Sequence, residues 1–431
     1  MSSGPTRLVA RSVAIPDPGD LLGFLADPDA RVWLREGDGL VAHGTVLRLP
    51  VPPGTARTAA ARSALAATWA DLDIVDDVGC PGSGPVAFAS LTFDPYAAGS
   101  VLVVPELVLG RADGQAWVTL LAPPEDPRLA DPAALLATHA PPVPHDRVRY
   151  AGSSLGEVQW LDAVARAVEA IASGHLAKVV LARDRVVWTR GTFDPRLLVR
   201  RLTARFPSCY TFAVDGLVGA SPELLVGRQG PTVTSRVLAG SARRGAEPAA
   251  DAAFGQALMS SAKDRAEHAF AADSVRDVLA GVLTSVTSDP DPWLLRLANV
   301  QHLATDVRGT LADGGPDALA LAGLLHPTAA VCGTPTGRAA ALIAEFEPFA
   351  RGRYAGPVGW IDTRGDGEFA IALRCAEVQQ GRARLFAGAG VVAGSLPEAE
   401  LEETRLKLRA MQSAVEGGQA AGDGEAAGLL T

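Results

Sequence analysis

The sequence predicts an α+β fold, and two observations support this class. Apolar segments rich in β-branched residues are joined by tight Asp-Gly and Gln-Gly turns, which is typical of antiparallel hairpins. Pairs of predicted helices are interleaved with these hairpins, whereas a parallel βαβ series would alternate single strands with single helices. No internal repeat is apparent in the 431 residues.

The first 121 residues predict short strands around one helix. The alanine-rich segment 56–72 has the composition of a helix. Strands are expected at residues 39–51, 85–93, 101–110 and 116–121. Residues 123–144 contain seven prolines, which few packed elements tolerate, so this segment is expected to be a connector or an irregular surface segment.

A more regular helical pattern begins at Ser154. Ser154 and Glu157 have the spacing of a capping box. Apolar residues follow at helical spacing as far as Ile171, and Gly174 is expected just beyond the end of this helix. A β-branched strand is then expected at 177–188.

The second half continues with strands and helices in turn. Residues 211–240 predict strands joined by the two glycine turns. Further helices are expected at 251–283, 317–325, 336–350 and 396–415, and further strands at 368–379 and 383–392. Ser395 and Glu398 again have the spacing of a capping box. The residues after the last helix are small and polar, which predicts a disordered tail.

Composition and charge exclude several classes of protein. Hydrophobic residues make up 48% of the chain, and the formal net charge of −9 argues against a nucleic-acid-binding protein. No uncharged apolar run approaches the roughly 18 residues of a membrane span, and the N-terminus lacks the apolar core of a signal peptide. The four cysteines are scattered without a CxxC pair, which predicts reduced thiols and a cytoplasmic protein.

Two charged helix faces and two isolated charged residues are candidate site residues. Asp264 and Glu267 share one helical face, and Glu400, Glu403 and Lys407 share another. Taken alone, each face is what a solvated helix presents.

Lys178 and Glu223 each have mostly apolar neighbours. A lysine in apolar surroundings can act as a base, and a half-buried glutamate can stay protonated and act as an acid. We interpret His302 and His326 as structural histidines and Cys332 as a small core residue.

The segment "GAGVVA", residues 388–393, matches a dinucleotide-binding fingerprint, but we reject that interpretation. Only about 40 residues follow it, too few for the second half of such a fold. We expect instead a glycine-lined strand end that admits a ligand close to the backbone amides.

Ten segments, in this order, resemble the chorismate-binding domain of the chorismate-utilising enzymes. They are "AKVVLAR", "ASPELLVG", "VLAGSARRG", "SAKDRAEH", "VQHLAT", "LLHPTAAVCGTP", "RGRYAGPVGW", "FAIALRCAEV", "LFAGAGVV" and "LEETRLK". The resemblance implies a single large domain of two antiparallel sheets flanked by helices. In it, residues 1–149 are a divergent N-terminal part of the same fold, residues 150–412 are the chorismate-binding catalytic region, and residues 413–431 are the disordered tail.

The resemblance also implies a Mg²⁺ site and a set of residues that contact the substrate. Glu267 and Glu403 would bind the ion, with Asp264 and Glu400 in contact with it through water. Mg²⁺ commonly uses one or two protein carboxylates together with water and substrate oxygens, which suits the dicarboxylate chorismate. The implied substrate-contacting residues are Ser241, Ala330, Tyr354, Arg374, Gly388, Ala389, Gly390 and Lys407.

Within this family the residues favour an isochorismate synthase, which adds water at C2 of chorismate while the C4 hydroxyl leaves. The resemblance makes Lys178 the base that activates water and Glu223 the acid that protonates the leaving hydroxyl. Ala239 stands where aminodeoxychorismate synthases have a nucleophilic lysine. Ala330 stands where the ammonia-using and salicylate-forming enzymes usually have threonine, although Ala329 departs from the family's common proline.

Two alternatives stay open at this stage. One is a salicylate synthase, which also eliminates pyruvate. The other is a non-catalytic chorismate-binding module, although a module of that kind would not need the acid and the base. The resemblance implies a monomer that acts on chorismate without nucleic-acid or membrane partners, and it leaves open whether the pathway is menaquinone or siderophore biosynthesis.

Overall fold

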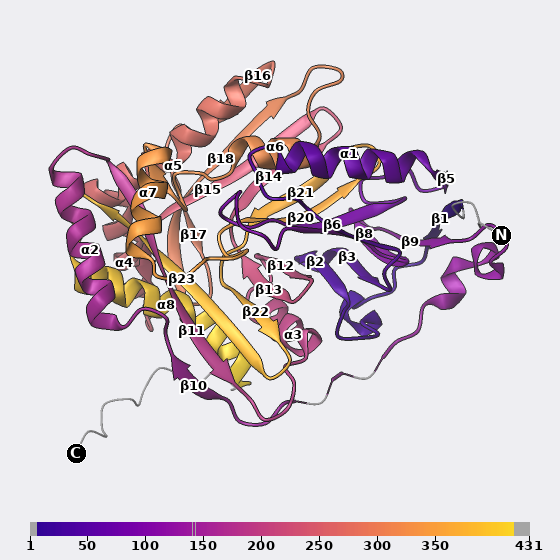
Figure 1. Ribbon diagram of the computed structural model, residues 1–431, viewed down its shortest axis with the longest axis horizontal. Helices are drawn as coiled ribbons and strands as arrows, with labels where there is room; N and C mark the ends of the chain where they lie inside the picture. The colour runs from indigo at the N-terminus through magenta and orange to yellow at the C-terminus, as the bar shows by residue number, and fades with distance from the viewer. Residues whose placement is uncertain (1–6, 140, 143, 418–431) are drawn as a thin grey trace.

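Two large β-sheets form the centre of the molecule, as the sequence analysis predicted (Figure 1). The computed structural model describes residues 7–139, 141–142 and 144–417. All strand pairs are antiparallel except β1 with β5. Along the first sheet the order is β10 (Arg149–Gly152), β11 (Lys178–Trp188), β23 (Arg382–Val392), β22 (Cys375–Gln379), β13 (Leu217–Ser221), β12 (Tyr210–Val214), β2 (Arg31–Arg35), β3 (Asp38–His43), β8 (Leu107–Ala112), β9 (Gln115–Ala122), β1 (Leu8–Ile15) and β5 (Leu72–Asp76), with β19 (Gly333–Thr334) on β11.

The second sheet combines strands from both halves of the chain. Its order is β16 (Ser285–Ser288), β18 (Val300–Thr310), β15 (Thr232–Arg243), β14 (Leu224–Gln229), β21 (Gly367–Ile371), β20 (Pro357–Asp362), β6 (Val86–Ser90), β7 (Val101–Val104) and β4 (Leu47–Pro50), with β17 (Trp293–Arg296) on β18. Strands from the N-terminal third therefore lie in both sheets.

The helices lie on the outside of the sheets (Figure 1). Helices α2, α3, α7 and α8 pack on strands of the first sheet, and α4, α5 and α6 pack on the second, with α1 against α6. Their bounds are α1 Arg57–Ala70, α2 Glu157–Ala172, α3 Pro195–Arg205, α4 Pro248–Ser260, α5 Ala262–Ala280, α6 Ala318–Leu325, α7 Thr336–Phe346 and α8 Pro397–Glu416. The described residues also form three short 3-10 helices, two of them within the proline-rich segment: Leu21–Phe24, Pro127–Ala130 and Pro132–Leu135.

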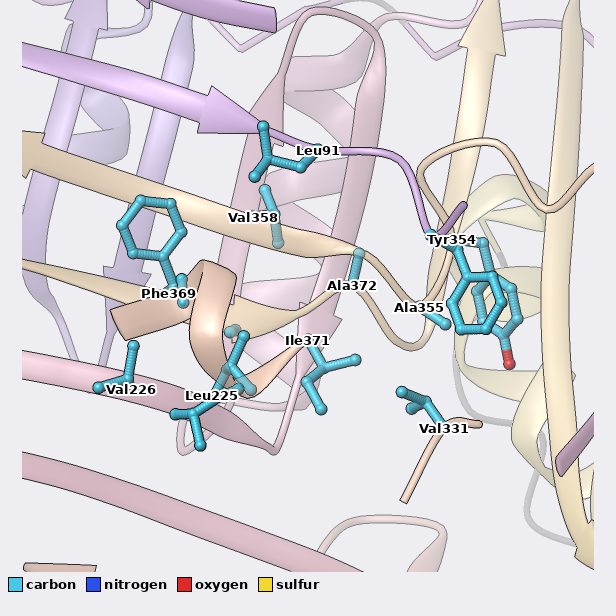
Figure 2. Packing of buried hydrophobic residues seen from close by; sticks show 14 of the residues in the cluster. Leu91, Leu225, Val226, Val331, Tyr354, Ala355, Val358, Phe369, Ile371 and Ala372 are labelled. Atoms are coloured by element: carbon cyan, nitrogen blue, oxygen red, sulfur yellow. The ribbon is translucent and has the colours of Figure 1, made fainter. Parts of the chain in front are cut away.

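One continuous hydrophobic core joins the two sheets. It contains Trp33 and Trp117 from the first sheet together with Phe88 and Phe369 from the second. Figure 2 shows Phe369, Val358, Tyr354, Ala355 and Val331, all members of this cluster. Tyr354, Ala355 and Val331 also line the cavity described below, so the core forms part of its wall.

Local chemistry explains most of the predicted hairpins. Asp215 and Gly216 have φ values of 50° and 82°, the left-handed pair that a tight two-residue hairpin requires. Gly230, at φ 55°, turns the chain between β14 and β15. Gly174 follows α2 with φ 77°, which confirms its predicted place beyond the helix end.

The predicted capping box at Ser154 is wrong. The Ser154 N–H and hydroxyl donate to the carboxylate of Asp184 at 2.7 and 2.5 Å, so Ser154 ties the helix entrance to β11. Helix α2 is capped at Gly156 instead, whose N–H donates to the side chain of Gln159 at 3.1 Å.

Two further helix predictions need correction. The helix expected at 251–283 is two helices, because Ser261 interrupts it and its hydroxyl accepts the N–H of Asp264 at 3.2 Å. Ser395 caps no helix: its hydroxyl accepts the N–H of Val392 at 3.1 Å, and α8 starts after Leu396. The strands that were not predicted are β1, β2, β5, β10, β16, β17, β18, β19 and β20. Strand β16, with the sequence SVTS, has no apolar run that would reveal it.

The ends of the chain are only partly described. Helix α8 continues to Glu416, four residues into the predicted tail, and the rest of that tail from residue 418 lies outside the described residues. None of the helices in the described ranges is long and apolar enough to span a bilayer.

Candidate active site

A cavity lies where the two sheets adjoin and helices α5 and α8 approach each other. Its walls come from β11 and β23 of the first sheet, β15 and β18 of the second, both helices and the connecting loops. The volume of the cavity is about 60 Å³. The predicted site residues that line it are Glu223, Ser241, Glu267, Ala330, Tyr354, Arg374, Gly388, Gly390, Glu403 and Lys407.

Lys178 lies directly behind the cavity wall. It is the first residue of β11, its side chain is 0% exposed, and its Nζ lies 3.2 Å from Oε1 of Glu267 in α5. Within the described residues this Nζ makes no hydrogen bond. A Cβ at Gly390 would come within 2.0 Å of Glu267 Oε1, so only glycine lets this carboxylate lie against β23.

Glu223 is a buried carboxyl between β13 and β14. Burial raises its pKa to about 8 from the ordinary 4.5, and the nearby charge of Lys178 only partly opposes this. Its Oε1 accepts a long hydrogen bond, 3.4 Å, from the N–H of Leu238. Glu223 therefore keeps its proton at neutral pH and can donate it to a leaving group.

Helix α8 brings charged side chains to the opposite wall. Lys407 Nζ lies 2.5 Å from Glu403 Oε1 and donates to the carbonyl of Gly388 at 2.9 Å. Burial favours the neutral form of Glu403, but the charge of Lys407 outweighs it and lowers the pKa of this carboxyl. Glu400 does not line the cavity: it is 2% exposed, bonds Lys263 at 2.7 Å, and has its pKa raised by burial and by the charge of Glu403.

A chain of polar contacts joins Arg374, His302 and Ser241. Arg374 Nη2 donates to His302 Nε2 at 3.0 Å, so the ring proton is on Nδ1, which lies 3.0 Å from Ser241 Oγ and 3.2 Å from the carbonyl of Gly240. Burial, followed by the charge of Arg374, lowers the pKa of His302 well below its usual value and keeps the ring neutral. His302 thus fixes the guanidinium of Arg374 against the cavity.

His302 is hydrogen-bonded on both ring nitrogens, in line with its interpretation as a structural histidine, and it also lines the cavity. Its partners are 61 and 72 positions away in the sequence, so no local pattern points to them. The structural interpretation holds for His326, whose Nε2 bonds the carbonyl of Phe93 at 2.9 Å, and for Cys332, which is fully buried.

Strand β23 presents an unpaired edge to the cavity. It pairs with β11 over its full length but with β22 only over its first four residues. On this side the backbone of Gly388 and Gly390 has no partner strand, although the Gly388 carbonyl accepts from Lys407. A Cβ at Gly388 would lie 2.9 Å from the Tyr354 hydroxyl. Ala389, which pairs with Leu181 of β11, does not line the cavity. These residues lie inside an extended strand, which confirms the rejection of the dinucleotide fingerprint.

Tyr354, Ala355 and Arg374 form a rigid part of the wall. The Tyr354 ring stacks on Phe386 with centroids 5.1 Å apart, and burial raises the pKa of its hydroxyl, which stays protonated. Ala355 and Arg374 have φ values of 62° and 48°, a left-handed conformation that is costly for residues other than glycine. Such strained residues cluster at functional sites.

The residues present fit a Mg²⁺ ion. Glu267 and Glu403, from two different helices, line the same cavity. Among the described residues no group of three or more His, Cys, Asp or Glu side chains converges on a metal position. Mg²⁺ needs only one or two protein carboxylates, because water and substrate oxygens complete its coordination. Asp264 is half-buried and does not line the cavity.

Taken together, the two-sheet fold and the charged cavity define an enzyme that binds a small anionic substrate. The family model described as "Chorismate binding enzyme" matches residues 20–416. The chain belongs to this family, which confirms the resemblance drawn from the ten segments.

Named relatives support the same branch of the family. The chain is 42% identical over 267 residues to "Isochorismate synthase DhbC" of Bacillus subtilis, which covers 59% of this chain and 67% of that protein. It is 42% identical over 253 residues to "Isochorismate synthase EntC" of Escherichia coli, covering 58% and 64%. The structure of MenF, the menaquinone-specific isochorismate synthase from Escherichia coli, superposes with a TM-score of 0.79 at 26% identity and covers 95% of this chain and 94% of that one.

Proposed function

We propose that this protein is an isochorismate synthase, a Mg²⁺-dependent isomerase that interconverts chorismate and isochorismate. The observation that carries the proposal is that the buried, protonated Glu223 lines the cavity while the buried Lys178 lies directly behind its wall, next to Glu267. The names of its relatives support the same activity.

The reaction needs one base and one acid. Lys178 accepts a proton from water as the water oxygen forms a bond to C2 of chorismate. The ring double bond shifts, the C4–oxygen bond breaks, and Glu223 donates its proton so that the hydroxyl leaves as water. One water enters and one leaves, so substrate and product are isomers, and the same groups serve the reverse reaction with exchanged roles.

Cationic groups around the cavity suit the two carboxylates of the substrate. Arg374, Lys407 and the backbone of Gly388 and Gly390 line the cavity and are available to them. Glu267 and Glu403 would hold Mg²⁺, which supplies positive charge to a substrate carboxylate when bound. Ala330 offers no hydroxyl where the salicylate-forming and ammonia-using branches usually have threonine, which favours water addition without pyruvate loss.

One incubation tests the proposal. The purified protein is mixed with chorismate and Mg²⁺ near neutral pH, and the products are identified by chromatography. We expect isochorismate in equilibrium with chorismate and little salicylate. Stoichiometric pyruvate and salicylate, followed with a lactate dehydrogenase coupled assay, would show a salicylate synthase instead. Binding of chorismate without any product would show a binding module.

A further inference from the structure

Strand β11 lacks a neighbouring strand for part of its length on the side away from β23. On that side β19 pairs with only its first two residues, and β10 pairs with it only from Val186 onward. In the interval the N–H of Val180 donates to the carbonyl of Cys332 at 2.8 Å. The next two backbone groups of β11 are bonded by side chains.

These side chains are Arg351 and Glu347, an ion pair in which each side chain is 3% exposed. Arg351 Nη2 donates to the carbonyl of Val180 at 2.7 Å, and its Nη1 donates to the carbonyl of Val331 at 2.9 Å. Glu347 Oε1 accepts the N–H of Ala182 at 2.8 Å, and Oε2 accepts from Arg351 Nε at 2.8 Å. The planar guanidinium thus joins two backbone segments, while the carboxylate balances its charge.

The segments that this pair joins form two walls of the cavity. Val180 and Val331 both line it, and the neighbouring Ala330 lines it as well, whereas Arg351 and Glu347 do not. The carbonyl of Arg351 also accepts the N–H of Tyr354 at 3.2 Å, which connects the pair to a third wall.

We propose that Arg351 and Glu347 are positioning residues that set the distance between β11, which carries Lys178, and the loop that carries Ala330. This inference rests on the proposed function, in which water reacts between these two elements. A hydrophobic contact could slide, but a forked guanidinium fixes both carbonyls at once. The pair therefore controls the alignment of the attacking water without touching the substrate.

Three variants separate positioning from simple stability. Arg351→Met with Glu347→Met removes both charges together, so that no lone buried charge is left. Arg351→Lys keeps the charge but loses the planar fork. The matched control is Arg364→Met, which breaks a contact of 3.0 Å to the buried Asp362, and Arg364 does not line the cavity.

The measurements are kcat and KM for chorismate, normalised to folded protein, together with the melting temperature of each variant. We expect both Arg351 variants to lose at least about tenfold in kcat, since misalignment of about 1 Å can cost about a hundredfold. Their KM should stay within about threefold of wild type, because Arg374 and Lys407 are unchanged. Arg364→Met should keep the wild-type kcat even where it melts lower.

Equal kcat in the Arg351 variants and the control, at comparable losses of melting temperature, would show that the pair is only structural. The same conclusion follows if Arg351→Lys matches wild type, because the shorter lysine lacks the planar fork that bonds both carbonyls and the Glu347 carboxylate together. Failure of the proposed function is a different result, since the wild-type protein would then form no isochorismate.

Discussion

Replacing Glu223 by glutamine is expected to stabilise the protein at neutral pH and to remove its acid. Burial raises the pKa of Glu223 to about 8 in the folded protein, against 4.5 ordinarily. The contribution of this group to stability is complete below pH 4.5 and is lost as the pH rises toward 8, because the unfolded chain releases the proton first. At pH 7 this loss lowers the free energy of unfolding by about 3 kcal/mol, because each pH unit above 4.5 removes about 1.4 kcal/mol.

Glutamine has nearly the same shape and does not ionise, so Glu223→Gln should recover most of this cost. Urea unfolding at pH 5, 7 and 8 gives the free energy of unfolding of both proteins. The difference in favour of the variant should fall below about 1 kcal/mol at pH 5. Its kcat should be about 10²- to 10⁴-fold lower. An advantage that does not change with pH, or a variant with wild-type kcat, would refute the assignment of a protonated Glu223.

Three further predictions concern the remaining site residues. Lys178→Ala should lose about 10²- to 10⁴-fold in kcat while chorismate binding, measured by equilibrium titration, persists; near wild-type kcat would mean that another group is the base. Glu267→Gln and Glu403→Gln should each abolish most turnover without changing the circular dichroism spectrum. EDTA should do the same to the wild type until Mg²⁺ is added, and full activity in metal-free buffer would contradict this metal site. Ala330→Thr should lower the rate of isochorismate formation by crowding the water, and amino products from ammonium salts at a comparable rate would contradict the role given to this position.

The sequence was sufficient to predict the fold class because the hairpin signals are local. The turn at Asp215 and Gly216 and the end of α2 at Gly174 depend on backbone conformations that few residues adopt. The capping box at Ser154 failed because Asp184, 30 positions away, competes for the same hydroxyl. A local motif cannot reveal such a competitor.

The site residues likewise fall into those that the sequence and the family resemblance identified and those whose contacts only the structure revealed. From helical periodicity alone, Glu267 and Glu403 lie on ordinary charged helix faces. Only the resemblance to a family distinguished them from solvated glutamates. The structure then placed both at one cavity and showed that Glu400 instead bonds Lys263. The contacts of His302 and Arg351 could not be predicted from sequence, because each residue bonds backbone or side chains that only the closed fold brings near it.

The position of β23 has a consequence for how the chain reaches its native state. This strand, the last in the sequence, lies between β11 and β22 in the first sheet. During synthesis on the ribosome, β11 must wait for about 200 further residues before its partner exists, and contacts so distant in sequence form slowly. Until β23 is synthesised, the apolar edge of β11 stays exposed. We therefore expect the nascent chain to be prone to aggregation and to bind chaperones.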